Sequence, residues 1–279
     1  GFMTPSVPFA ERWKIIMKLL SAACSDIGIR KHVNQDAVLI RSAVGKEGEV
    51  LLAAVCDGMG GLEKGEVASG EVIRGLSRWF EEKLPKLLVD GDDKMLLGEK
   101  QKKSIETSLE NLIQEENQKI SVYGEKRNLL LGTTVSAILL TSGWYLIVQV
   151  GDSRIYELTD KIRQITKDQT YVQREVDAGR LTEKQAQCHP KKNVLLQCIG
   201  VKKEVTPVYY RGNYEPGKGF LVCSDGFRNR VSLEELQEKF CGNFPGEESE
   251  MEARIREGIE LNKRRMETDN ISAILIYVN

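Results

Sequence analysis

Residues 51–61 are LLAAVCDGMGG, an apolar run of strand length that ends at Asp57 among glycines. The same arrangement occurs twice more, because Asp152 follows YLIVQVG and Asp225 follows FLVCS. A carboxylate directly after a buried strand is held on a rigid element that faces a cleft. We therefore expect these three aspartates at the ends of buried strands, pointing toward a shared site.

Two further acidic segments, Asn34-Gln35-Asp36 and Asp269-Asn270, stand beside predicted strands. Several carboxylates cannot converge without repulsion unless a cation neutralises them. Oxygen ligands select Mg²⁺ or Mn²⁺ over softer metals, and a glycine beside the acid lets the backbone carbonyl reach the ion. A single Asp-Gly pair is explained by a turn, but its repetition at strand ends predicts a divalent metal site.

Strands and helices are predicted in separate blocks, which indicates an α+β layered fold rather than alternating βαβ units. Thr141-Ser142-Gly143 predicts a tight hairpin turn between two strands. Segments rich in β-branched and aromatic residues predict strands at 37–42, 50–56, 134–140, 144–150, 155–158, 220–223 and 271–278. Segments rich in helix formers predict helices at about 65–88, 102–127, 233–240 and 249–265.

Residues 4–20 open with prolines and then predict a short amphipathic helix, with Trp13, Met17 and Leu20 at helical spacing. We expect this helix to pack on the main body, and the alternative is docking to a partner or a membrane surface. Gly1-Phe2 before Met3 resemble a cloning remnant. The chain is thus divided into an N-terminal extension, 1–20, and one domain, 21–279.

Composition excludes several classes of protein. The 40 Lys and Arg residues nearly balance the 41 Asp and Glu residues, which argues against a dedicated nucleic-acid binder. No apolar run approaches the ~18 residues of a membrane-spanning helix. The six cysteines contain no C-x-x-C pair, which argues against a cysteine-rich zinc site and a disulfide framework. We expect a cytoplasmic protein that is a monomer.

Taken together, the acidic segments resemble the PP2C (PPM) family of metal-dependent Ser/Thr protein phosphatases, in its bacterial form. The resemblance extends over residues 21–279 and includes the Gly-Asp-Ser-Arg sequence at 151–154. Residues 171–200 are similar to the family's flap. The resemblance implies a four-layer αββα sandwich, with two central antiparallel sheets flanked by helix pairs. The matching segments are 25–28, 34–36, 57–61, 132–134, 150–154, 166–170, 224–226 and 269–270.

The resemblance also implies two Mn²⁺ or Mg²⁺ ions with a possible third. Asp57 would bridge two ions, the Gly58 carbonyl would bind one of them, and Asp225 and Asp269 would bind the other. A bridging metal-held water would attack phosphorus directly, so no phosphoenzyme would form.

Two more aspartates have implied roles at the edge of this centre. Asp36 would contact an ion through water, in the outer shell. Asp152, with Asp225, would form the third and weaker metal site. The implied partners are phosphorylated proteins, substrates of a Ser/Thr kinase.

The residue that binds the substrate phosphate is ambiguous. Counting from Gly28 in the bacterial pattern leads to Lys31, whereas Arg30 is the chemically natural choice because arginine can bind phosphate through two parallel hydrogen bonds. We favour Arg30. Two departures concern other positions: Gln35 stands where the family often has Glu, and Met59 where many members have His.

Three alternatives stay open. The chain could be a catalytically weak pseudophosphatase that binds phosphoproteins, or a phosphatase dedicated to one regulator such as an anti-sigma-factor antagonist. Cys24 and Arg30 also have the C-x5-R spacing of cysteine-dependent phosphatases. Asp26 inside that loop would repel a phosphate, which argues against this third alternative.

Overall fold

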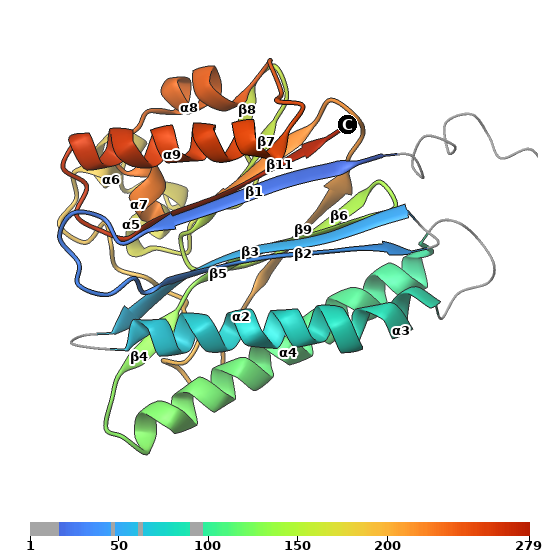
Figure 1. The fold of residues 1–279 in the computed structure, drawn as a ribbon. Coiled ribbons are helices and arrows are strands. Elements are labelled where there is room, and N and C mark those ends of the chain that lie inside the picture. Colours follow the sequence, from blue (N-terminus) through green and yellow to red (C-terminus); the bar gives the residue numbers. More distant parts are fainter. Residues whose placement is uncertain (1–16, 46–47, 61–63, 90–96) are drawn as a thin grey trace, which may run out of the picture.

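The computed structural model describes residues 17–45, 48–60, 64–89 and 97–279. Two antiparallel sheets pack face to face, and helices cover the outer face of each sheet (Figure 1). This arrangement confirms the αββα sandwich that the resemblance implied.

Sheet I and sheet II are named here by their strands. Sheet I contains, in spatial order, β1 (Leu19–Asp26), β11 (Ile271–Val278), β10 (Gly219–Cys223), β7 (Arg154–Leu158) and β8 (Ile162–Gln164). Sheet II contains β2 (Asp36–Gly45), β3 (Gly48–Gly60), β5 (Val135–Thr141), β6 (Trp144–Val150) and β9 (Val208–Asn213), and β4 (Leu131–Thr133) pairs with β3.

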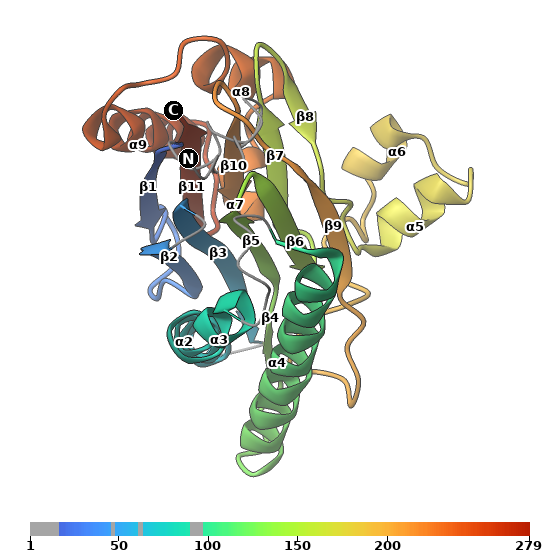
Figure 2. The same ribbon diagram turned by 90° about the vertical axis from the view of Figure 1, so that its right-hand side faces the viewer.

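The helices follow the layers. In Figure 1, α8 and α9 lie over sheet I, while α2, α3 and α4 lie under sheet II. Figure 2 shows α5 and α6 outside the layers, beside β9. No helix among the described residues has the length and apolar character needed to cross a membrane. The helices are α2 (Gly65–Glu82), α3 (Leu84–Val89), α4 (Glu99–Glu125), α5 (Tyr171–Asp177), α6 (Glu183–Gln187), α7 (Asp225–Arg228), α8 (Leu233–Phe240) and α9 (Glu248–Arg264).

Side-chain alternation along β3 explains how one strand serves two cores. Val55 belongs to the apolar core between the two sheets, and Cys56 belongs to the core between sheet II and its helices. Because successive side chains of a strand point to opposite faces, Asp57 points back between the sheets. A single strand therefore anchors both cores and presents its carboxylate at the sandwich end.

The predicted hairpin turn is confirmed. Thr141 pairs with Trp144, and the two residues between them have positive φ, 52° for Ser142 and 73° for Gly143. Positive φ at both central residues is the backbone geometry that suits the twist of a two-residue hairpin. The predicted helix at 65–88 is interrupted at Lys83, where α2 ends and α3 begins.

The N-terminal prediction needs a correction. Residues 1–16, which include most of the predicted amphipathic helix, lie outside the described residues. The helix does not extend to Leu20, because Leu19 and Leu20 belong to β1, where they pair with Val278 and Tyr277. The pairing partner lies more than 250 residues away in sequence, and a local helical pattern cannot reveal it. The short strands β4, β8 and β9 are likewise not predicted by the sequence pattern.

Candidate active site

Four aspartates reach one end of the sandwich from both sheets. Asp36 and Asp57 lie directly opposite each other in the β2–β3 ladder. Asp225 opens α7 immediately after β10, and Asp269 precedes β11, which is the neighbour of β10. In Figure 1 this end lies at the left, near α7 and β4. The predicted convergence of strand-end carboxylates is therefore present.

Gly58 allows the chain to fold tightly beside Asp57. A Cβ at Gly58 would lie 2.3 Å from the Gly65 carbonyl oxygen and 2.5 Å from that of Gln35. The Gly58 N–H donates to the Gln35 carbonyl at 3.1 Å. Since both obstructing atoms belong to the backbone, no larger residue fits without moving β2 or α2.

The carboxylates strongly perturb one another. Burial raises the pKa of Asp57 well above its usual range, and the charges of Asp36 and Asp225 raise it further. Burial also raises the pKa of Asp36 to about 7, and Asp225 adds to this effect. The hydrogen bond from the Ser272 hydroxyl to Asp36 Oδ2, at 2.6 Å, works in the opposite direction. Such a cluster can stay ionised at neutral pH only with cations nearby.

The donor set fits hard divalent ions. Its side chains are carboxylates, to which the resemblance adds the Gly58 carbonyl, and Asp36 Oδ1 is buried with no hydrogen-bond partner among the described residues. Within the described ranges, no three Asp, Glu, His or Cys side chains surround a single point as they stand. Ions held by one or two carboxylates and completed by water are the usual form for Mg²⁺. The cluster therefore suits divalent ions because its ligands are oxygens and carry negative charge, and not because three or more side chains already surround one point.

Lys31, rather than its neighbour Arg30, contacts one aspartate of the cluster. Lys31 Nζ lies 2.9 Å from Asp269 Oδ1. Partial burial works to lower the pKa of Lys31, but its hydrogen bond to Asp269 raises the pKa overall. Arg30 is exposed and forms no hydrogen bond or ion pair with the described residues. The β1–β2 loop thus turns the side chain of Lys31, rather than that of its neighbour, toward the site.

Asp152 has a different environment from the other aspartates. Burial raises its pKa to about 7 and the charge of Asp225 contributes, but the cation of Arg228 opposes the rise. Arg228 Nη2 donates to the Asp152 carbonyl oxygen at 2.9 Å and lies 4.0 Å from Asp152 Oδ2. Sequence reasoning missed Arg228 and also Ser272. One signal was present, because Arg228 follows Asp225 by three residues and so lies on the same side of a helical turn.

Residues 171–200, predicted as a flap, stand beside the sandwich and carry α5 and α6 (Figure 2). Both ends of the segment are tied together at its base. The Tyr171 N–H donates to the Val194 carbonyl at 2.8 Å, and the Leu196 N–H donates to the Gln169 carbonyl at 2.8 Å. The segment therefore forms a loop that projects from the sandwich and whose two ends are hydrogen-bonded to each other.

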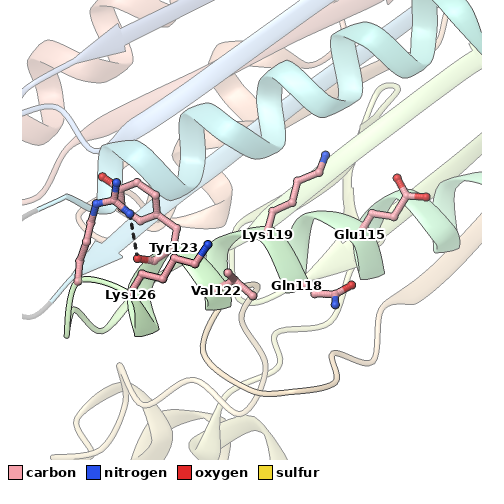
Figure 3. Close-up of a pocket in the computed structure, with 7 residues that line it drawn as sticks. Glu115, Gln118, Lys119, Val122, Tyr123 and Lys126 are labelled. Atoms are coloured by element: carbon pink, nitrogen blue, oxygen red, sulfur yellow. Dashed lines mark hydrogen bonds between the residues drawn. The ribbon is translucent and has the colours of Figure 1, made fainter.

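One cavity among the described residues lies away from the aspartates. It measures about 560 Å³ and runs along the C-terminal part of α4, where Lys119, Tyr123 and Lys126 line it (Figure 3). All its lining residues come from this one helix and the turn after it. None of the aspartates discussed above contributes to it, so we place the chemistry at the carboxylate cluster and not here.

The environment of Cys24 argues against a cysteine-dependent phosphatase mechanism. Cys24 lies in β1 with its side chain buried against α9, where its Sγ lies 3.8 Å from the Glu252 carbonyl oxygen. Burial raises the pKa of the Cys24 thiol, and the nearby Glu252 also raises it. A cysteine nucleophile requires the opposite shift and an accessible sulfur.

Comparison with known proteins agrees with the site. The family model for "Protein phosphatase 2C" matches residues 29–257. A serine/threonine phosphatase, stp, of Listeria innocua is 33% identical over 217 residues, which cover 77% of this chain and 80% of the relative.

Solved structures show the same fold. The serine/threonine phosphatase PstP of Mycobacterium tuberculosis is 32% identical, with a TM-score of 0.74 over 93% of this chain and 98% of that one. A structure of the PstP catalytic domain in complex with two manganese ions is 31% identical, with a TM-score of 0.73 over 94% of this chain and 99% of that one. The family match spans most of the chain and its sequence relatives are bacterial, so this protein belongs to the protein phosphatase 2C family.

Proposed function

We propose that this chain hydrolyses phosphoserine and phosphothreonine in proteins at the cluster formed by Asp36, Asp57, Asp225 and Asp269. The chain is a metal-dependent protein phosphatase by family. The observation that supports the assignment to this cluster is the convergence of four carboxylates from both sheets at one end of the sandwich. Mn²⁺ or Mg²⁺, as two ions, is the expected cofactor.

Each residue has a task that follows from its position. Asp57 and the Gly58 carbonyl, at the end of β3, would hold ions from sheet II, while Asp225 and Asp269 would hold them from sheet I. Asp36, which accepts a hydrogen bond from the Ser272 hydroxyl, would accept a proton or a hydrogen bond from a water between the sheets. When bound, the ions supply the acidity that activates water and the charge that stabilises the phosphoryl oxygens.

The test is hydrolysis of p-nitrophenyl phosphate and of a phosphothreonine peptide with Mn²⁺, Mg²⁺ or EDTA. Metal-dependent release of phosphate that EDTA abolishes supports the proposal. Absence of release from folded, Mn²⁺-loaded protein would instead favour the phosphoprotein-binding pseudophosphatase, with Gln35 as the first residue to examine.

Lys31 is expected to bind the substrate phosphate. Lys31→Ala should raise KM for the phosphothreonine peptide by about 10- to 100-fold, since a hydrogen bond to a charged group contributes roughly 1.5–3 kcal/mol. Arg30→Ala is the matched control and should change KM by less than about twofold. Steady-state kinetics on both variants decide the matter, and a larger effect at Arg30 would restore the original preference.

Cys24→Ser should leave kcat and KM unchanged, because the thiol lies in the core between β1 and α9. The buried hydroxyl has a cost in stability of about 1–3 kcal/mol, so a lower Tm with intact kinetics is the expected pair of results. Inactivity of a variant that is folded at the assay temperature would return the thiolate mechanism to consideration.

The finer assignments extend the proposal. We place the protein in the cytoplasm as a monomer that acts on substrates of a Ser/Thr kinase, without binding nucleic acid. A role dedicated to one regulator remains the narrower alternative, and the N-terminal extension is the part of the chain that could supply such specificity. Phosphoproteome comparison of cells with and without the gene would distinguish one substrate from many.

A further inference from the structure

We infer that Arg228 takes the place of a third divalent ion, so that Asp152 is neutralised by a fixed guanidinium and is not a metal ligand in this enzyme. The inference rests on the proposed two-ion function. It changes the role that the family resemblance implied for Asp152, and it assigns Arg228 as a positioning residue.

The first step is the placement of Arg228. It comes from α7, the helical turn that Asp225 opens, and its side chain is only 14% exposed. Nη2 donates to the Asp152 carbonyl oxygen at 2.9 Å and to Asp168 Oδ2 at 3.4 Å. These contacts fix the guanidinium beside the Asp152 carboxylate, whose Oδ2 lies 4.0 Å away.

The second step is the local charge balance. Arg154 binds Asp168 with two parallel hydrogen bonds, from Nε at 2.7 Å and from Nη2 at 2.8 Å. That pair satisfies Asp168 by itself. Arg228 therefore contributes one further positive charge, which acts on the carboxylate of Asp152 and also on that of Asp225, three residues before it in the same helical turn. The group of Arg154, Arg228, Asp152 and Asp168 is neutral without any metal ion.

The contrast with Asp57 gives the third step. The four charged neighbours that act on Asp57 most strongly are the aspartates Asp36, Asp225, Asp152 and Asp269. Asp57 therefore needs a bound cation to stay ionised, whereas Asp152 already has the guanidinium of Arg228 beside it. A divalent ion beside Asp152 would meet a fixed like charge, and like charges at close range disfavour binding.

Lys31 does not neutralise Asp269 in the fixed way in which Arg228 neutralises Asp152. Its side chain is 41% exposed and its contact to Asp269 is made from a loop at the open end of the sandwich. A flexible lysine there can turn from the carboxylate to a substrate phosphate. Arg228 is held by a backbone carbonyl and by Asp168, and it has no such freedom.

The test counts bound manganese by equilibrium dialysis and elemental analysis in the full chain. Wild type should bind two ions per chain, and Asp152→Asn should still bind two. Arg228→Met should bind a third ion at least tenfold more tightly than wild type does, and Arg228→Met combined with Asp152→Asn should lose it again. Arg74→Met, an exposed arginine on α2, is the matched control and should bind two.

Three wild-type ions, one of which is lost in Asp152→Asn, would overturn the inference, as would a count of two in folded Arg228→Met. If Arg228→Met fails to melt cooperatively, the comparison of wild type with Asp152→Asn still decides, because it leaves the arginine in place. Failure of the proposed function has a different signature, namely wild type that binds no manganese and releases no phosphate under any metal.

Discussion

Asp225→Asn is expected to abolish turnover while the fold persists. Asp225 sits at the first residue of α7, and its carboxylate faces Asp57 and Asp269 from the side of sheet I. Asparagine has the same shape but removes the negative charge that holds an ion. We expect kcat for a phosphothreonine peptide to fall by at least roughly 10²–10³-fold, the loss typical for removal of one preorganised electrostatic contact.

The measurement pairs kinetics with thermal unfolding. Without metal, the Tm of Asp225→Asn should equal or exceed that of wild type, because burial and the charge of Asp269 outweigh the opposing charge of Arg228, raise the pKa of Asp225 and so penalise its ionised form. With Mn²⁺ in excess, wild type should gain stability by about 2.7 kcal/mol for each bound ion at 100 times its Kd, and the variant should gain less. Activity near that of wild type would show that Asp225 is not a ligand.

Gly58→Ala is expected to have the largest effect on stability. The added Cβ would meet two backbone oxygens, those of Gly65 and Gln35, at 2.3 Å and 2.5 Å. Backbone cannot swing away as a side chain can, so β2 or the start of α2 must shift. We expect a loss of about 3 kcal/mol, at the upper end for an overpacked site, which is roughly 6–12 °C in Tm.

Gly246→Ala is the matched control, because its Cβ would meet no atom within 4 Å and its φ is not positive. Its Tm should stay within about 2 °C of wild type. Gly58→Ala should also lose most of its activity, since the shift displaces the carbonyl and the carboxylate at the end of β3. A Tm equal to that of the control would mean that the Gln35–Gly58–Gly65 contact relaxes at no cost.

The sequence by itself determined the elements whose signals are local. The strands β3, β5, β6 and β7 and the helices α4, α8 and α9 follow from runs of β-branched residues or helix formers. Ser232 caps the N-terminus of α8, where its hydroxyl accepts from the Glu235 N–H. The acidic residues were also visible, because each stands where an apolar run begins or ends. Their order and spacing were sufficient for the family.

The tertiary structure alone decided which of these groups meet. Lys31 and Arg30 are adjacent in sequence, and only the path of the β1–β2 loop shows which one reaches Asp269. Arg228 and Asp152 are 76 residues apart, and their contact exists because β10 and β7 are neighbours in sheet I. Strand β1 exists only because β11 pairs with it. Spacing along a chain records neither the turn of a loop nor the pairing of distant strands, since those depend on what the rest of the chain packs against.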